Sequence, residues 1–269
     1  MAALSPIAWI GQRRRNVMRI YLAQKAMLIV VTLAIASTAR AQTASTSFSA
    51  TQRHDIELIV RDYLIENPEV LREASIELER RTQEAQRNSQ TQAIAKYHDQ
   101  LVSSRGSIVL GNPNGTVNMV AFFDYNCPFC RASVDDIQTL IEANPDLRVV
   151  LKEFPILGQE STEASHVALA ASRQFQNADL QAHYYRALMK VKGTMNGELA
   201  LLIGEKFGLN ETQARKDLHD KQIDAILSEN MSIAEALGVN GTPSFVIGNN
   251  LIVGAVGAVQ IQQIIDTSR

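Results

Sequence analysis

The sequence predicts an α/β domain that carries a helical insertion and follows an N-terminal helical arm. An apolar run over residues 117–123 (VNMVAFF) is typical of a buried strand, and apolar residues at helical spacing follow it from Ala132. Residues 160–237 hold only helical patterns, and strand patterns return after them. The order strand–helix–strand, helices, strand–strand–helix is that of a thioredoxin fold with an inserted helical domain.

Turn signals and connections set the order and direction of the strands. The expected strands are residues 108–110, 117–123, 149–154, 244–247 and 251–253. The first two are separated by a turn sequence, GNPNG, over residues 111–115. A helix connects the second strand to the third, so these two should be parallel, whereas a hairpin turn at Asn249–Asn250 joins the last two. A final helical pattern closes the domain, which we assign to residues 105–269.

The only two cysteines, Cys127 and Cys130, lie where the central strand turns into a helix. A Cys-x-x-Cys pair in that position is the signature of a redox site. Unpaired N–H groups and the helix dipole favour negative charge on the first sulfur, and the thiolate is the form that attacks a disulfide. Pro128 suits the first helical turn, where its missing N–H breaks no helical bond. We therefore expect Cys127 to attack and Cys130 to resolve the mixed disulfide.

Two other uses of this cysteine pair fit the sequence less well. A zinc site of four cysteines is excluded by the count, and no two of the five histidines have the close spacing of a site with two cysteines and two histidines. A structural disulfide across two intervening residues would close a very short loop and remove little chain entropy. The redox interpretation is favoured because the strand, the motif and the helix agree.

Residues 1–41 have the pattern of a secretory signal peptide. A basic region precedes an apolar run over residues 27–36, which is short for a membrane span, and Ala39 and Ala41 mark a cleavage site after Ala41. An uncleaved anchor is the alternative. Residues 1–41 hold six of the 26 lysines and arginines and none of the 28 acidic residues, so the rest of the chain has a net charge of −8. That charge argues against nucleic acid as a partner.

Residues 42–104 are expected to form the helical arm, after a small polar leader over residues 42–50. Apolar stripes at helical spacing occur around Ile59 and around Leu71, with a break at Asn67–Pro68. These stripes are too small to form an independent core, so they must cover another surface. The polar stretch that follows favours a projecting arm that self-associates, and packing against the α/β domain is the alternative.

Three segments resemble one family. Residues 122–130 (FFDYNCPFC) resemble the active-site segment of the DsbA-like thiol–disulfide oxidoreductases, and residues 241–245 (GTPSF) resemble their cis-proline loop. Residues 63–71 (YLIENPEVL) are similar to the N-terminal region of the ScsC-like branch of that family. The resemblance extends over most of residues 51–269.

The resemblance implies which residues form the site. Cys127 and Cys130 would be catalytic, and the two residues between them, Pro128 and Phe129, would tune the thiols. A cis bond between Thr242 and Pro243 would place the Thr242 backbone beside the Cys127 sulfur, where it could pair with an extended client segment. No metal and no organic cofactor would be required.

The resemblance also implies partners and a compartment. Members of the ScsC-like branch are bacterial periplasmic or surface proteins, and several are homo-oligomers built through their N-terminal helices. We therefore expect a periplasmic protein that acts on disulfide-containing secreted clients and forms a dimer or trimer through residues 51–104. A membrane redox partner would recycle its cysteines. The branch is also linked to copper tolerance and to disulfide isomerisation.

Ala121 departs from the pattern of this family. DsbA-like proteins usually carry a buried acid at that position, six residues before the first cysteine, and this acid is thought to help move the proton of the resolving cysteine. Lys152 and Glu153 on the neighbouring strand are candidates for that task, and a surface salt bridge is the alternative for this pair. For Asp124 we expect a role in a turn or helix cap.

Phe129 indicates the direction of the redox chemistry. A phenylalanine can donate neither a hydrogen bond nor a charge to the thiolate, as a histidine could, so we expect a site less oxidising than a Cys-Pro-His-Cys site and nearer that of an isomerase. A disulfide isomerase or reductase is therefore favoured. Two alternatives stay open: a monomeric oxidase whose arm folds back on the domain, and a copper-tolerance protein whose two thiolates bind Cu(I).

Overall fold

The computed structural model describes residues 48–103, 105–175 and 177–269. The predicted signal peptide and most of the predicted leader lie outside these residues. The chain divides into two compact units at the Glu73–Ala74 junction. In the described ranges, no helix is both long and apolar enough to cross a membrane.

The first unit holds α2 (Ala50–Glu66) and the start of α3 (Glu69–Lys96). Asn67, where the sequence predicts a break, is the residue that caps the C-terminus of α2. Its backbone N–H donates to the Tyr63 carbonyl at 2.8 Å. No residue of α2 is buried. Its exposed apolar side chains are Ile56, Leu58, Ile59, Val60, Tyr63 and Ile65.

The second unit is built on a sheet with the strand order β1-β3-β2-β4-β5. The strands are β1 (Ile108–Gly111), β2 (Val117–Phe123), β3 (Leu147–Glu153), β4 (Ser244–Ile247) and β5 (Asn250–Val253). β2 and β3 run parallel, with Ala121 opposite Leu151, and every other neighbouring pair in this sheet is antiparallel. The parallel pair and the closing hairpin are both confirmed.

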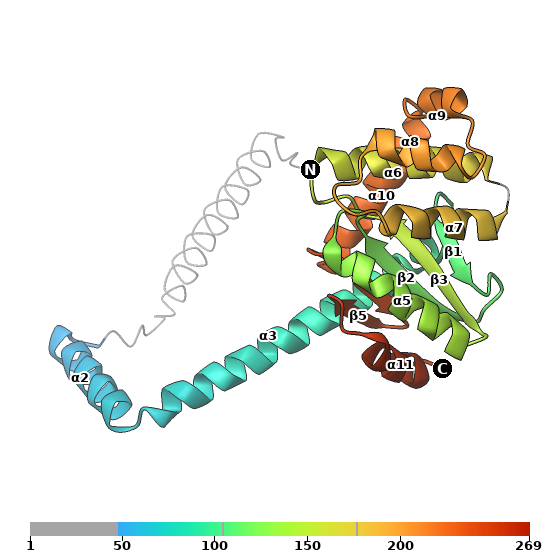
Figure 1. Ribbon diagram of the computed structural model, residues 1–269. Helices are drawn as coiled ribbons and strands as arrows, with labels where there is room; N and C mark the ends of the chain where they lie inside the picture. Colours follow the sequence, from blue (N-terminus) through green and yellow to red (C-terminus); the bar gives the residue numbers. More distant parts are fainter. Residues whose placement is uncertain (1–47, 104, 176) are drawn as a thin grey trace, which may run out of the picture. The chain divides into compact units, whose positions relative to one another are not determined.

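Helices surround this sheet and fill the stretch between β3 and β4. Those of the second unit that follow α3 are α4 (His98–Val102), α5 (Pro128–Ala143), α6 (Gln159–Gln174), α7 (Ala178–Met189), α8 (Gly197–Glu205), α9 (Glu211–Asp217), α10 (Lys221–Leu237) and α11 (Ala258–Thr267). α6 to α10 occupy the segment that the sequence analysis describes as an insertion. Figure 1 shows α6, α8 and α9 gathered beyond the sheet, whereas α5 lies beside it. The predicted fold class is confirmed.

Successive side chains of β2 point to opposite faces of the sheet, and both faces are buried. Met119, Ala121 and Phe123 point into one core, which also contains both cysteines and most of the insertion. Val120 and Phe122 point into a second core on the opposite face, which the C-terminal part of α10 covers. The redox pair therefore belongs to one face of the sheet only.

Ile94 and Leu101 lie in this second core, and each is 2% exposed. Both belong to the arm that is predicted over residues 42–104. Here they pack with Val120 and Phe122 of the same chain, so the last turns of α3 and all of α4 help to form the core of the second unit. An apolar stripe shows that a helix covers a surface, but the pattern alone does not say whose surface it is.

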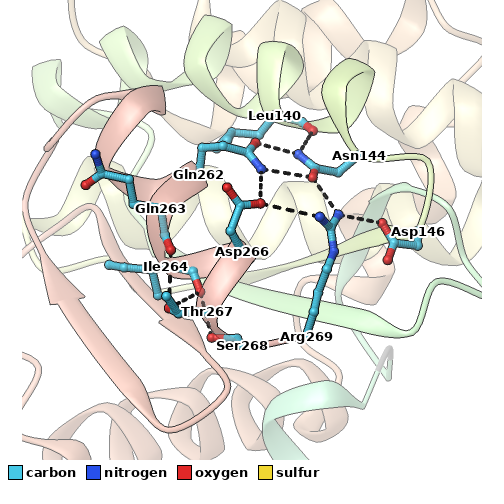
Figure 2. A network of polar contacts seen from close by, with 10 residues as sticks. All are labelled: Leu140, Asn144, Asp146, Gln262, Gln263, Ile264, Asp266, Thr267, Ser268 and Arg269. Carbon is cyan, nitrogen blue, oxygen red and sulfur yellow. Dashed lines mark hydrogen bonds and ion pairs between the residues drawn. The ribbon is translucent and has the colours of Figure 1, made fainter.

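A polar network ties the C-terminal end of α5 to α11 (Figure 2). The Asn144 and Gln262 side chains exchange two hydrogen bonds, of 2.7 and 3.1 Å. Asn144 Nδ2 also donates to the Leu140 carbonyl, one of the last of α5. Arg269 Nη2 donates to Asn144 Oδ1 at 2.6 Å and to Asp146 Oδ1 at 2.9 Å. A cation at a helix C-terminus is favoured by the helix dipole, so the end of α5 remote from the cysteines is held firmly.

The packing of α4 can be tested with one pair of leucines. We expect Leu101→Ala to lower the free energy of unfolding by about 2–5 kcal/mol, because it opens a cavity in the second core. Leu202→Ala is the matched control, since Leu202 on α8 is 55% exposed; its effect should stay within about 0.5 kcal/mol. Urea unfolding measures both, and equal losses would show that Leu101 does not belong to the domain core.

Candidate active site

Cys127 is the N-cap residue of α5, as the sequence predicts. Its N–H donates to the Asp124 carbonyl, and its own carbonyl accepts from the Arg131 N–H, both at 3.1 Å. Pro128 is the first residue of the helix. These bonds place the sulfur at the end of α5 where free N–H groups favour an anion. Cys127 is 4% exposed, so a client can reach only a small part of it.

The loop before β4 supplies the neighbour of this sulfur. The Thr242–Pro243 peptide bond is cis, as predicted. The Cys127 thiol donates to the Thr242 carbonyl at 3.1 Å. The Gly254 N–H donates to the Pro243 carbonyl at 2.8 Å, which fastens the loop to the end of the hairpin. The structure thus brings together the two segments that were predicted to form the site.

Cys130 lies one turn further into α5 and is 2% exposed. Both cysteines are free thiols in this structure. Burial raises the pKa of Cys130, and the nearby Cys127 adds to this rise. Cys130 therefore keeps its proton at neutral pH, and any reaction that joins it to Cys127 must remove that proton.

Apolar side chains stand at the surface around the buried thiols. Phe129 is 63% exposed between the two cysteines, and Leu157 in the loop after β3 is 49% exposed. The Leu157 N–H donates to Asp124 Oδ2 at 3.0 Å, so its loop is fixed to the turn that precedes Cys127. These two exposed positions, one between the cysteines and one on the loop bonded to the turn before Cys127, are therefore apolar rather than charged.

Asp124 is fully buried and organises the turn before Cys127. Its Oδ1 accepts from the Asn126 N–H at 2.7 Å, which is the predicted turn role, and from the Ser161 hydroxyl at 2.8 Å. Its Oδ2 accepts from the N–H groups of Ile156 and Leu157 at 2.9 and 3.0 Å. The bonds from Ser161, Ile156 and Leu157 were not predicted, because these donors lie more than thirty residues away in the chain.

Asn126 fastens the same turn to the segment before α8. Its Nδ2 donates to the Met195 carbonyl at 2.8 Å, and its Oδ1 accepts from the Met195 N–H at 2.6 Å. Nδ2 also donates to the Ser161 hydroxyl at 3.0 Å. The helical insertion is thus joined directly to the residue that precedes Cys127. No sequence signal predicted this contact, because an asparagine in a turn is ordinary.

Lys152 and Glu153 do not form the surface salt bridge that the sequence analysis left open. They are adjacent on β3, so their side chains point to opposite faces, and both are nearly fully buried. Lys152 Nζ donates to the Ser103 carbonyl at 2.9 Å. Glu153 lies on the face that carries the cysteines, where it accepts from the Tyr125 hydroxyl at 2.8 Å. Burial lowers the pKa of Lys152 to about 8 and raises that of Glu153 to about 8.

The chain matches a known family over most of the second unit. The profile described as the DSBA-like thioredoxin domain matches residues 118–266, which run from β2 into α11 and include the site. The chain belongs to this family. A second profile, described as the copper resistance protein ScsC N-terminal domain, matches residues 52–85. The protein is therefore an enzyme, a thiol–disulfide oxidoreductase of the DsbA and ScsC type.

Solved structures of similar proteins agree with this assignment. A thioredoxin-like oxidoreductase from Silicibacter pomeroyi DSS-3 is 39% identical, covering 64% of this chain and 96% of that one, with a TM-score of 0.60. Proteus mirabilis ScsC, in a mutant with a linker deletion, is 27% identical and covers 84% of this chain and 98% of its own, with a TM-score of 0.62. The thiol–disulfide exchange protein α-DsbA2 of Wolbachia pipientis is 29% identical and covers 68% and 97%, with a TM-score of 0.61.

A curated relative also supports the assignment to thiol–disulfide oxidoreductases. The Bacillus anthracis protein named probable disulfide bond formation protein D is 28% identical over 151 residues, which are 53% of this chain and 70% of that protein. Similarity to ScsC extends over more of the chain than similarity to this relative, because it includes the N-terminal helices.

The exposure of Phe129 allows a direct test of its effect on the redox potential. Phe129→His should make the site more oxidising by about 30 mV or more, a tenfold change in the equilibrium constant, because imidazole can donate to the Cys127 thiolate and stabilise the reduced form. Phe129→Leu is the control and should leave the potential nearly unchanged. Equilibration with glutathione redox buffers measures all three proteins, and equal potentials would contradict this role of Phe129.

Proposed function

We propose that the chain is a periplasmic disulfide isomerase and reductase that acts on secreted proteins through Cys127 and Cys130. The observation that carries this proposal is the position of the Cys127 sulfur, at the N-terminus of α5 and 3.1 Å from the Thr242 carbonyl. A nucleophile at a helix N-terminus, beside backbone groups that can pair with a client strand, suits attack on protein disulfides.

The reaction begins when the Cys127 thiolate attacks a client disulfide. The client's S–S bond breaks, a mixed disulfide with Cys127 forms, and one client sulfur leaves as a thiolate. In isomerisation, another client thiolate attacks the mixed disulfide and releases Cys127. In reduction, Cys130 attacks Cys127 instead, so the client leaves reduced and the enzyme becomes oxidised.

The residues around the sulfur would bind and position the client and would not themselves exchange electrons with it. The backbone of Thr242, next to Pro243, would pair with an extended client segment. Phe129 and Leu157 are exposed beside this position and would contact apolar client side chains, which misfolded proteins expose. Pro128 would keep the first turn of α5 in place.

The exposed apolar face of α2 supports self-association. Ile56, Ile59, Val60 and Tyr63 recur at helical spacing, and each is at least 41% exposed. A dimer or trimer through the predicted region, residues 51–104, would bury this face. Because Ile94 and Leu101 already pack in their own chain, the available surface lies N-terminal to Ile94. An oligomer would present several active sites to one client.

The sequence and the family support a periplasmic setting for this activity. Cleavage of the signal peptide after Ala41 would leave residues 42–269 in the periplasm. Disulfide-containing secreted proteins would be the clients, and a membrane redox partner would restore the thiols. The net charge of −8 in residues 42–269 does not suit nucleic acid.

A copper function is the second candidate. The family profile that matches residues 52–85 bears the description of a copper resistance protein, and both cysteines are free thiols. Two thiolates suit Cu(I), which prefers soft ligands. Among the described residues, no group of three or more histidine, cysteine or acidic side chains could hold a metal ion, so the thiol pair would have to bind copper largely by itself.

Reactivation of scrambled ribonuclease by reduced protein, residues 42–269, tests the proposed function. We expect activity to return, because client thiols can attack the mixed disulfide and reshuffle wrong pairings. Failure, with both thiols intact by titration, would favour an oxidase of the DsbA type. Defined binding of Cu(I) without reduction of insulin would favour the copper candidate.

Self-association has its own variant pair on α2. Ile59→Asp should lower the mass measured by sedimentation to that of one chain and should reduce the isomerase activity several-fold, with the redox potential unchanged. His54→Asp adds the same charge at another exposed position of α2 and is the control. A wild-type protein that sediments as a single chain would contradict the oligomer and favour the monomeric oxidase.

A further inference from the structure

Glu153 is a buried acid on the side of the sheet that carries the thiols. It is the last residue of β3, it is 3% exposed, and it pairs in register with Phe123 of β2. Its Oε1 accepts from the Tyr125 hydroxyl and its Oε2 accepts from the Ser165 hydroxyl, both at 2.8 Å. Ionised carboxylates are rarely buried without a cation, so this one requires an explanation.

No cation neutralises Glu153 in the described part of the chain. Its partners Tyr125 and Ser165 are neutral, and Asn230 of α10 donates only to the Glu153 backbone carbonyl, at 3.1 Å. Lys152 points to the opposite face of the sheet. The other titratable groups that face this carboxyl are Asp124, Tyr125, Tyr184 and Tyr185, and none of them is a cation.

Burial without a cation changes the protonation of Glu153. It raises the pKa of Glu153 to about 8, the charge of Asp124 adds to this rise, and the bonds from Tyr125 and Ser165 oppose it. A carboxyl with this pKa binds and releases a proton near neutral pH, unlike an exposed glutamate. Thiol–disulfide exchange operates in the same pH range.

An aromatic cluster lies beside Glu153, in the same core as the thiol pair. Phe123 packs edge-to-face on Tyr125 and on Tyr185, with ring centroids 5.1 and 5.3 Å apart, and the Tyr125 and Tyr185 centroids are 6.4 Å apart. The pKa of Tyr185 is raised by burial, then by the charge of Cys130 and then by that of Glu153. Tyr185 therefore lies close enough to Cys130 and to Glu153 for the charge of either group to act on its hydroxyl.

We propose that Glu153 accepts the proton that Cys130 loses when Cys130 resolves the mixed disulfide, and that the hydroxyls of Tyr185 and Tyr125 carry the proton to it. The inference rests on the resolving role of Cys130 in the proposed function. Glu153 touches neither sulfur, so it is a positioning residue that acts through the tyrosines.

Atoms and charges balance in this step. Cys130 forms a bond to the Cys127 sulfur, the bond between Cys127 and the client breaks, and the client sulfur leaves with the electron pair as a thiolate. The proton of Cys130 ends on the Glu153 carboxylate, which becomes a neutral acid. Cys130 and Cys127 are oxidised to a disulfide and the client is reduced, so no other oxidant is needed.

A single-turnover measurement isolates this step from any isomerase activity. Residues 42–269 are reacted with dithionitrobenzoate, so that Cys127 carries a thionitrobenzoate, and the release of this group by Cys130 is followed between about pH 6 and pH 10. We expect the wild-type rate to rise through a step near pH 8, as Glu153 becomes ionised. Glu153→Gln should lack the step and be slower by about tenfold or more above it.

Two further variants show whether the step belongs to Glu153. Ser165→Ala removes a bond that lowers the pKa of Glu153, so the step should move to higher pH without disappearing. Glu163→Gln changes an exposed glutamate of α6 and should match the wild type. Tyr185→Phe should slow the release, because it interrupts the path.

Stability gives a readout that does not depend on the chemistry. The pKa of Glu153 is higher in the folded than in the unfolded chain, so its contribution is fully present at acidic pH and is lost as pH rises towards about 8. The unfolding midpoint of Glu153→Gln should therefore fall less than that of the wild type between about pH 6 and pH 9. This comparison also shows that the variant folds.

Three results would overturn the inference. One is a pH step in Glu153→Gln at the wild-type position, and another is a uniform loss of rate at every pH, which would indicate a structural role only. The third is wild-type protein in which Cys130 releases no thionitrobenzoate. A normal step in a protein that fails to reactivate scrambled ribonuclease would support the inference and refute the isomerase proposal, so the two can fail separately.

Discussion

The active site depends on the buried carboxylate of Asp124. It accepts four hydrogen bonds, from the turn before Cys127, from the loop after β3 and from Ser161 of α6. Bonds to a charged group contribute more than neutral ones, and loss of the acceptor would leave two backbone N–H groups, those of Ile156 and Leu157, without this partner. This one side chain therefore fixes both the approach to the nucleophile and the exposed apolar residue beside it.

The helix that carries the thiols is held at both ends. At its N-terminus, Cys127 contacts the Thr242 carbonyl, and Asn126 binds Met195 of the insertion. At its C-terminus, Asn144 and Arg269 join α5 to α11. Attack on a client disulfide requires the Cys127 sulfur to be held in a fixed position. Rigid elements hold a reacting atom more precisely than loops do. The long insertion between β3 and β4 is compatible with such precision because it is bonded to the turn itself.

The sequence predicted the parts of this arrangement that depend on local patterns. The apolar run over residues 117–123, the cysteine spacing and the Thr242–Pro243 bond all have local signals, and all were confirmed in place. The packing of Leu101 in its own domain was only the alternative to self-association, because an amphipathic stripe does not show which surface it covers. The contact between Asn126 and Met195 was not predicted, because these residues lie 69 positions apart and no sequence pattern relates them.

The position of Glu153 shows how a fold can keep an acid near its thiols while moving it in the sequence. Ala121 occupies the place where the resembling family usually has an acid, and it points to the same face as Glu153. The register places Ala121 opposite Leu151, so Glu153 stands two residues further along the neighbouring strand. There the Tyr125 hydroxyl donates to the acid, and Tyr185 of the same aromatic cluster lies close enough to Cys130 for their charges to interact, which is the route proposed for the proton. The face of the sheet, rather than the position in the chain, determines which acid can serve the resolving thiol.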